Sequence, residues 1–108
     1  MSLNSKRVAY FEKKLTKSYV ENDDFILPSN ILEFLPDTDN EAVVIFERGA
    51  YNMKYKVGAH TRLYQGWKEF IDANRLRTRD VLCFKACDAA NDRIAFLINK
   101  KQEIIEIA

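Results

Sequence analysis

The stretch "TRLYQGWKEFIDANRLRTRDVLCF", Thr61 to Phe84, decides how the whole chain is interpreted. Its extended beginning stops at Gly66, a short helix follows, and a basic segment precedes a new apolar strand. The helix has one face with the spacing i, i+3, i+4 and i+7, formed by Trp67, Phe70, Ile71 and Asn74. Because such a face must pack against other structure, the stretch predicts a helix that closes one end of a sheet.

The segments before this stretch have the patterns of strands. Residues 51–57 alternate apolar and polar side chains, which is typical of a half-buried strand with Lys54 and Lys56 on its wet face. The continuous apolar run "AVVIF", residues 42–46, predicts a strand that is buried on both faces. Gly49 lies between the two segments, and we expect it to take a positive φ in the turn.

The two ends of the chain supply further elements. Residues 8–15 and 25–28 predict strands separated by a loop, and Ser29 is the expected N-cap of another helix, which Pro36 ends. Further strands are expected over residues 81–84 and 94–98, and a last strand or packed strap over residues 102–108. About seven strands without a βαβ rhythm favour a mainly β domain, a barrel with antiparallel connections whose mouths two short helices cover.

Length and composition restrict the class of protein. A chain of 108 residues with 47% hydrophobic side chains suits a single folded domain, residues 1–108. No apolar run reaches the roughly 20 residues of a membrane helix and no signal-peptide core is present, so we expect a soluble, intracellular protein. Cys83 and Cys87 would lie about 13 Å apart on one strand, too far for a disulfide. With one histidine in the chain, we expect reduced thiols and no metal.

Charges are segregated along the chain, although the net charge is only +1. Residues 1–20 carry five basic side chains and one acidic one, and residues 21–41 carry seven acidic side chains and no basic one. Residues 42–80 carry eight basic and four acidic side chains. The fold converts this pattern either into a basic face with an acidic back or into a mixed, solvated surface.

Several motifs together resemble a known family. They are "FEKKLTKS" at residues 11–18, "FILPSNIL" at residues 25–32, Gly66-Trp67 at the helix start, and "NRLRTRDV" at residues 74–81. In this order and at these distances they resemble the plant B3-type DNA-binding domain, and most of all its reproductive-meristem branch. The resemblance covers residues 10–99 and leaves residues 100–108 as a C-terminal strand or strap.

The resemblance implies a seven-stranded open pseudo-barrel with two short α-helices that holds double-stranded DNA between two loops. The first jaw, residues 17–24, follows the first strand, and the second jaw, residues 56–62, joins the fourth strand to the fifth. Both would enter the major groove, and Gly66 and Trp67 would anchor the helix that fixes the second jaw. The domain would act in the nucleus as the DNA-binding module of a plant transcription regulator, without a cofactor and with weak or poorly selective binding.

The chemistry of DNA recognition selects residues within and near these jaws. Reading the major groove needs paired donors and acceptors on thin loops, and phosphates need cations or hydroxyls nearby. Gly58 and Ala59 are small enough for the backbone to approach the bases. The residues expected at DNA are Lys17, Ser18, Asn22, Lys56, His60, Thr61, Arg62, Arg75 and Arg77.

Ordinary structural roles remain open for the same side chains. His60 either contacts a base or phosphate or is a solvent-exposed loop histidine. Arg62 either contacts DNA or pairs with a carboxylate at a strand edge. Lys54 and Lys56 form a solvated strand face, and this face either also contacts the DNA backbone or contacts only solvent. The densest basic stretch, residues 75–79, either contacts phosphates or is surface charge.

Three positions depart from the usual pattern of the family. Tyr19 stands where Asp is common, and it either stacks on a base or ribose or covers the barrel rim. The jaw tip "ENDD", residues 21–24, is acidic where a basic tip is common, so it would repel phosphates or accept a hydrogen bond from a cytosine amine. Arg79 replaces a glycine, which predicts a strained turn or an additional phosphate contact.

Enzymatic function is not expected. The sequence contains no Gly-x-Ser-x-Gly motif, no phosphate-binding glycine loop and no metal-ligand spacing, and an apolar strand would raise the pKa of Cys83. We therefore expect neither a small-molecule substrate nor a membrane partner. The main alternative is a protein-interaction module that keeps the barrel but has lost DNA binding. A third is the target-recognition part of a nuclease, which would need a partner domain.

Overall fold

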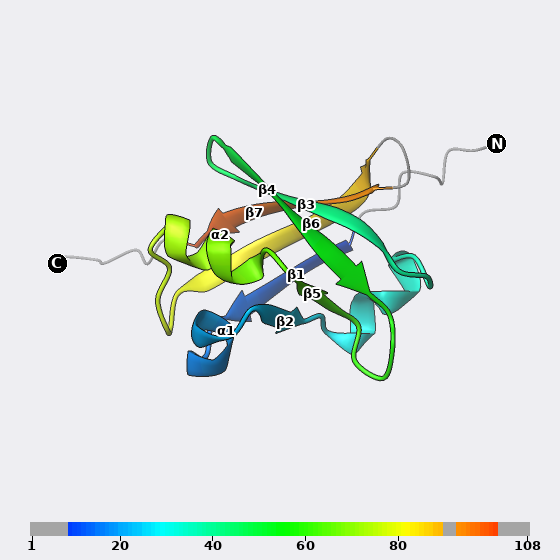
Figure 1. The fold of residues 1–108 in the computed structure, drawn as a ribbon, viewed down its shortest axis with the longest axis horizontal. Helices are drawn as coiled ribbons and strands as arrows, with labels where there is room; N and C mark the ends of the chain where they lie inside the picture. The colour runs from blue at the N-terminus through cyan, green and yellow to red at the C-terminus, as the bar shows by residue number, and fades with distance from the viewer. Residues whose placement is uncertain (1–8, 90–92, 102–108) are drawn as a thin grey trace, which may run out of the picture.

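The computed structural model describes residues 9–89 and 93–101 and confirms a mainly β, seven-stranded open half-barrel with two short α-helices (Figure 1). None of the described helices is long and apolar enough to cross a membrane. The strand or strap expected over residues 102–108 lies outside the described residues. The elements are β1 (Ala9–Lys14), α1 (Lys17–Glu21), β2 (Asp24–Ile26), the 3-10 helix η2 (Ser29–Phe34), β3 (Asn40–Phe46), β4 (Gly49–Lys56), β5 (Arg62–Tyr64), α2 (Trp67–Ala73), β6 (Val81–Ala89) and β7 (Arg93–Lys100).

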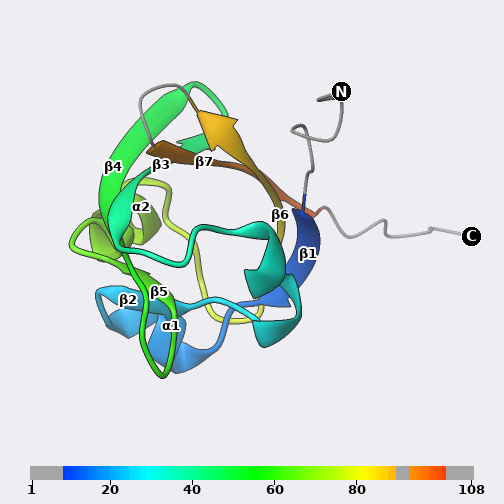
Figure 2. The same ribbon diagram turned by 90° about the vertical axis from the view of Figure 1, so that its right-hand side faces the viewer.

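All seven strands belong to one sheet in the order β1-β6-β7-β3-β4-β5-β2, which curls around the core (Figure 2). The expected antiparallel pairing is wrong at one place, because β3 and β7 run parallel from Glu41 opposite Arg93 to Phe46 opposite Ile98. The strand β7 pairs with β6 on one side and with β3 on the other. The second edge of β3 is already paired with β4, so β7 occupies its remaining edge. β1 and β2 are left as the two edges of the sheet.

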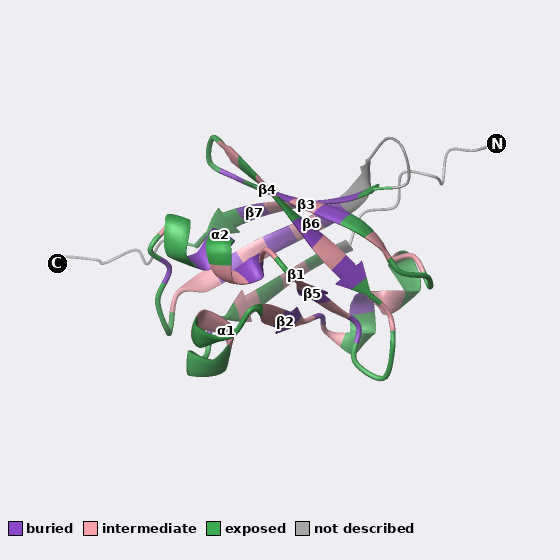
Figure 3. Cartoon of the chain, viewed as in Figure 1, coloured by how far each residue is buried: buried purple, intermediate pink, exposed green. Residues whose placement is uncertain are grey.

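The core is built around a stack of aromatic rings inside the curled sheet. The ring of Phe25 lies 4.5 Å from that of Trp67 and 5.1 Å from that of Phe84, and the ring of Phe84 lies 4.4 Å from that of Phe11. Trp67 is fully buried, as the helical spacing predicted, and Figure 3 shows buried residues along the strands and in α2, whereas the residues of α1 are exposed or intermediate. Ring contacts of this kind add about 0.5–1.5 kcal/mol each to area burial.

The strand patterns are confirmed for β4 and corrected for β3. In β4, Met53 and Tyr55 are buried and Lys56 is exposed, which is the predicted alternation. In β3 the apolar run is not buried on both faces, because only one face meets the core and Ile45 on the other is 37% exposed. The turn between them also differs, since Glu47 and not Gly49 has a positive φ, 55°.

The helices near the N-terminus differ from expectation. Residues 17–21 form α1 where a loop was expected, with the Thr16 side chain accepting a hydrogen bond from the Tyr19 N–H at 3.4 Å. Ser29 is not an N-cap, because it starts the 3-10 helix η2 and the cap position is Pro28, which has no capping side chain. The two short α-helices of the fold are therefore α1 and α2, and the helix expected after Ser29 is a 3-10 helix instead.

The ends of α2 use unusual backbone conformations. Gly66 precedes it with φ 150°, and a Cβ at this position would lie 2.3 Å from the Asn52 carbonyl oxygen. After α2, Arg75 takes φ 53°, and the N–H groups of Arg75 and Leu76 bond to Asp72 and Ile71 carbonyls in the pattern of a Schellman motif. Arg79, where the family favours glycine, has φ 84°, which confirms the strained turn.

The thiol of Cys83 is free and half-buried, as expected. Burial raises the pKa of this thiol, and the nearby carboxylate of Glu12 raises it further. The side chain of Cys87 lies outside the described residues.

Candidate nucleic-acid interface

The two jaws project from the same side of the molecule. Figures 1 and 2 both show α1, which belongs to the first jaw, and the loop between β4 and β5, which is the second jaw, at the lower edge of the barrel. In Figure 1 the two are separated along the long axis, with the strands β2 and β5 between them. This arrangement leaves one continuous side on which both jaws can meet the same partner.

The antiparallel pairing of β2 with β5 sets the spacing between the bases of the jaws. The first jaw leads into Asp24, which pairs with Tyr64, and the second leads into Arg62, which pairs with Ile26. A further bond joins the Leu27 N–H to the carbonyl of Thr61 at 2.9 Å, so four residue pairs connect the strands. At about 3.4 Å per residue, the three steps from the Asp24–Tyr64 pair to the Leu27–Thr61 bond separate the two ends of this ladder by roughly 10 Å, similar to the ~12 Å width of a DNA major groove.

Most of the residues expected at DNA are accessible. Seven are exposed: Lys17, Ser18, Asn22, Lys56, His60, Arg75 and Arg77. Arg62 is half-buried in β5, with its guanidinium 5.8 Å from the centre of the Tyr64 ring. Thr61 is different, because it is only 5% exposed and its carbonyl oxygen extends the pairing of β2 with β5. Its side chain is therefore inaccessible.

The accessible cations of this group are unpaired within the described residues. No described carboxylate lies within ion-pair distance of Lys17, Lys56, Arg62, Arg75 or Arg77. Lys54, by contrast, donates to Glu41 at 2.6 Å, and this hydrogen bond raises the pKa of the ammonium group. Lys54 thus belongs to an ion pair, whereas the unpaired cations can neutralise phosphates.

The backbone of Arg79 joins the end of the densest basic stretch, residues 75–79, to the base of the first jaw. The Arg79 N–H donates to the Leu15 carbonyl at 2.8 Å, and the Leu15 N–H donates to the Asp80 carbonyl at 2.8 Å. Leu15 directly precedes Thr16, the residue that caps α1. These bonds therefore place the end of the basic stretch beside the start of the first jaw, whose tip is acidic.

The second jaw is fastened at its base by an acidic loop. The Val57 N–H donates to the Asp39 carboxylate at 2.9 Å, and the Tyr55 hydroxyl donates to the Pro36 carbonyl at 2.6 Å. Burial raises the pKa of Tyr55 to about 12, and the carboxylates of Asp37 and Asp39 add to the effect. Beyond this base Gly58 has open space around it, since a Cβ there would meet nothing within 4 Å.

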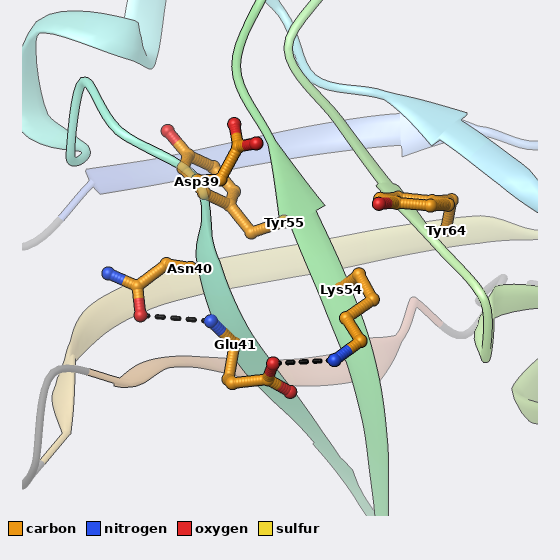
Figure 4. A pocket seen from close by; sticks show the side chains of 6 residues that line it. All are labelled: Asp39, Asn40, Glu41, Lys54, Tyr55 and Tyr64. Carbon is orange, nitrogen blue, oxygen red and sulfur yellow. Dashed lines mark hydrogen bonds and ion pairs between the residues drawn. The ribbon is translucent and has the colours of Figure 1, made fainter.

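An open hollow lies beside this base (Figure 4). Two of its carboxylates are already engaged, Asp39 by the Val57 N–H and Glu41 by Lys54. The hollow is therefore part of the structure that holds the base of the second jaw. The lining residues are Asp39, Asn40, Glu41, Lys54, Tyr55 and Tyr64.

The first jaw is fastened to α2, which we expected to fix the second. The indole N–H of Trp67 donates to the Tyr19 carbonyl at 2.8 Å, and the ammonium of Lys68 donates to the Val20 carbonyl at 3.0 Å. The carboxylate of Asp23 accepts from the N–H groups of Gly66 at 3.2 Å and Lys68 at 2.9 Å. Sequence reasoning missed this role of Asp23 and Lys68, because their partners are more than 40 residues away.

Tyr19 covers the rim of the barrel, one of the two roles left open for it. Its ring is half-buried and lies 4.9 Å from that of Phe25, and the Lys13 ammonium lies 5.5 Å from its centre. Burial raises the pKa of its hydroxyl, and Asp24 adds to the shift.

Comparison with known proteins identifies the family. The family model of the B3 DNA binding domain matches residues 11–102, so the chain belongs to the B3 DNA-binding domain family. No curated protein matches the chain significantly. Among the described residues, no group of three or more His, Cys, Asp and Glu side chains is placed to hold a metal ion.

Solved structures share the fold at low sequence identity. A hypothetical protein of Arabidopsis thaliana matches with a TM-score of 0.66 and 18% identity, over 85% of this chain and 90% of that one. Arabidopsis FUS3, in a complex with DNA, matches with a TM-score of 0.59 and 17% identity, over 85% of this chain and 95% of that one. The N-terminal domain of Helicobacter pylori LlaJI.R1 matches with a TM-score of 0.56 and 17% identity, over 86% and 81%.

Proposed function

We propose that this domain binds double-stranded DNA by placing its two jaws in the major groove, as the DNA-binding module of a plant transcription regulator in the nucleus. The observation that carries the proposal is the position of the jaws, on one side of the barrel and at opposite ends of the paired strands β2 and β5. Membership of the B3 family and the shared fold with FUS3, which is described in a complex with DNA, support it. The reproductive-meristem branch remains a prediction.

The proposed contacts divide into two kinds. Ser18, Asn22 and His60 are exposed on the jaws and offer donors and acceptors to base edges. The unpaired cations supply phosphate contacts and the electrostatic part of the affinity, and they are Lys17, Lys56, Arg62, Arg75 and Arg77. We leave out Thr61, because its side chain is buried.

A salt titration tests this proposal. Affinity for random and selected duplexes, measured by fluorescence anisotropy, should fall with a slope of log K against log salt of about −0.9 per phosphate contacted. Arg62→Glu should lower the affinity at least tenfold at moderate salt, and His60→Ala should reduce discrimination among duplexes more than affinity for random DNA.

A charge-matched control separates this effect from a change in net charge. Arg93 is exposed in β7, on the far side of the barrel from β2 and β5, so Arg93→Glu should change DNA affinity far less than Arg62→Glu (Figure 1). Absence of salt-dependent binding to any duplex, or equal effects of the two reversals, would contradict the proposal. The acidic tip of the first jaw favours the alternative, a protein-interaction module, which predicts no binding in the same titration.

A further inference from the structure

The acidic tip of the first jaw contains one carboxylate with a defined internal function. Asp23 Oδ1 accepts hydrogen bonds from the N–H groups of Gly66 and Lys68, at the start of α2. These N–H groups have no partner within a helix, and the residue at the N-cap, Gly66, has no side chain to accept from them. Asp23 thus performs, from a distant part of the chain, the role of an N-cap, where negative charge is also favoured by the helix dipole.

Two more bonds join the same pieces of the molecule. The Trp67 indole donates to the Tyr19 carbonyl and the Lys68 ammonium to the Val20 carbonyl, at 2.8 and 3.0 Å. We call these four bonds the α1–α2 clamp. Figures 1 and 2 both show α1 directly below α2.

The first jaw depends on this clamp for its shape. α1 has five residues and none of them is buried. Its one capping side-chain bond, which the Thr16 hydroxyl accepts from the Tyr19 N–H, is long at 3.4 Å. A helix this short is unstable alone, because nucleation is unfavourable and few internal bonds follow. The bonds to α2 at Tyr19, Val20 and Asp23 therefore fix the position of Asn22 from both sides and that of Ser18 from its C-terminal side.

We propose that Asp23 is a positioning residue for DNA recognition, which fixes the first jaw through the α1–α2 clamp and does not itself contact DNA. This inference rests on the proposed function. It predicts an unusual sign for the effect of removing an acidic residue. Neutralising a carboxylate near phosphates normally strengthens binding, whereas loss of the Asp23 acceptor should weaken it, because the jaw loses its fixed geometry.

Three variants separate position from charge. Asp23→Ala removes the acceptor and should weaken duplex binding roughly tenfold, a loss comparable to that of a helix cap. Asp23→Asn keeps an oxygen acceptor without the charge and should bind DNA as well as the natural chain or more tightly. Glu21→Ala is the matched control: Glu21 is exposed on the same jaw and its side chain makes no hydrogen bond or ion pair to a described residue, so affinity should stay equal or rise.

Each other pattern contradicts the inference. If Asp23→Ala binds as tightly as Asp23→Asn, Asp23 is only a repelling charge. If both variants weaken binding equally, the charge itself is needed, as in a direct contact with a base. If Glu21→Ala weakens binding as much as Asp23→Ala, Asp23 has no special position in the jaw.

Trp67 gives a readout that does not depend on DNA. It is the only tryptophan in the chain, so its indole N–H gives a single resonance in a nitrogen–proton NMR spectrum. In Asp23→Ala this resonance should shift and exchange faster with water, and in Asp23→Asn it should stay close to its original position. An unchanged resonance in Asp23→Ala would refute the clamp, whereas a natural chain that binds no duplex would refute only the proposed function.

Lys68→Met provides a second variant in case Asp23→Ala does not fold. It removes the bond to the Val20 carbonyl and should weaken DNA binding several-fold without changing the salt slope, because Lys68 contacts protein groups and not phosphate. Lys17→Met should instead reduce the slope by about 0.9. A slope reduced equally in both variants would show that Lys68 contacts DNA and would contradict its place in the clamp.

Discussion

The two jaws are held in opposite ways. The first is short, partly helical and joined to α2 by four hydrogen bonds, one of which comes from the buried core residue Trp67. The second is fastened at its base, where Asp39 accepts from Val57, while Gly58 and His60 beyond are exposed. A fixed element loses little freedom on binding, and an open loop can adjust to its partner. The comparison therefore distinguishes a rigid first jaw from a second jaw that can adjust to its partner.

The jaws also differ in how their acidic neighbours are used. In the first jaw Asp23 bonds to backbone N–H groups, and near the second Glu41 pairs with Lys54 and Asp39 caps the loop. Carboxylates that look unfavourable for a DNA-binding surface are thus partly engaged in holding that surface in shape. For this reason, a count of charges along the sequence overstates how many carboxylates near the two jaws are unengaged.

The largest expected effect comes from breaking the junction between the jaws. Gly66 lies between β5, which follows the second jaw, and α2, which holds the first. Gly66→Ala should destabilise the fold by about 3 kcal/mol or more, because a Cβ would lie 2.3 Å from the Asn52 carbonyl oxygen and φ is 150°. Urea denaturation followed by tryptophan fluorescence measures the change.

Gly58→Ala is the matched control for this variant. A Cβ at Gly58 would meet nothing within 4 Å, so the free energy of unfolding should change by less than about 0.5 kcal/mol. Similar losses in the two variants would contradict the view that one glycine is a packed junction and the other an open tip.

Alkaline pH should loosen the base of the second jaw. The pKa of Tyr55 is raised from 10.0 to about 12, so the folded state holds this proton more tightly than the unfolded state does. The resulting stabilisation is present in full below pH 10 and is lost as pH rises to 12, in total about 2–3 kcal/mol. Urea denaturation between pH 8 and 12 should show this loss in the natural chain.

Tyr55→Phe isolates this group from the other titrations. It should lower stability at neutral pH by about 1 kcal/mol, because the Pro36 carbonyl loses its hydrogen bond, and it should remove this part of the alkaline decline. Tyr10→Phe, at a residue that is 67% exposed, should leave the decline in place. An identical decline in Tyr55→Phe and the natural chain would show that Tyr55 is not its cause.

The smallest expected effect concerns the strained turn beside the first jaw. Arg79 has φ 84°, so Arg79→Gly should stabilise the fold by about 1 kcal/mol, measured by thermal unfolding. Arg77→Gly is the control and should destabilise it, because the φ of Arg77 is not positive and glycine adds only unfolded-state freedom. Destabilisation by both changes would mean that the Arg79 side chain stabilises the base of the first jaw more than its backbone strains it.

Local sequence patterns predicted correctly the elements that have one buried face and one exposed face. The stripe of Trp67, Phe70 and Ile71 and the alternation in β4 were predicted correctly, because each records a single boundary between core and water. The run in β3 was misjudged, since a continuous apolar sequence does not reveal that Ile45 faces outward. Tertiary burial, not local pattern, decides such a strand.

The parts that the sequence did not reveal depend on distant partners. The segment of α1 has no apolar stripe, and the bonds that support it come from Trp67 and Lys68. The parallel pairing of β3 with β7 joins segments about 50 residues apart, and no local sequence pattern indicates it. The candidate cations were chosen from charge and resemblance, whereas the burial of Thr61, whose carbonyl extends the pairing of β2 with β5, has no local sequence pattern.

The central place of the last described strand has a consequence for biosynthesis. β7 lies between β6 and β3, so the two halves of the sheet stay unjoined until residue 100 has left the ribosome. Nascent chains shorter than this expose unpaired strand edges, which favours aggregation and capture by chaperones. A chain that ends before β7 would lack the strand that joins the two halves of the sheet, so we expect the fold to be completed late in synthesis.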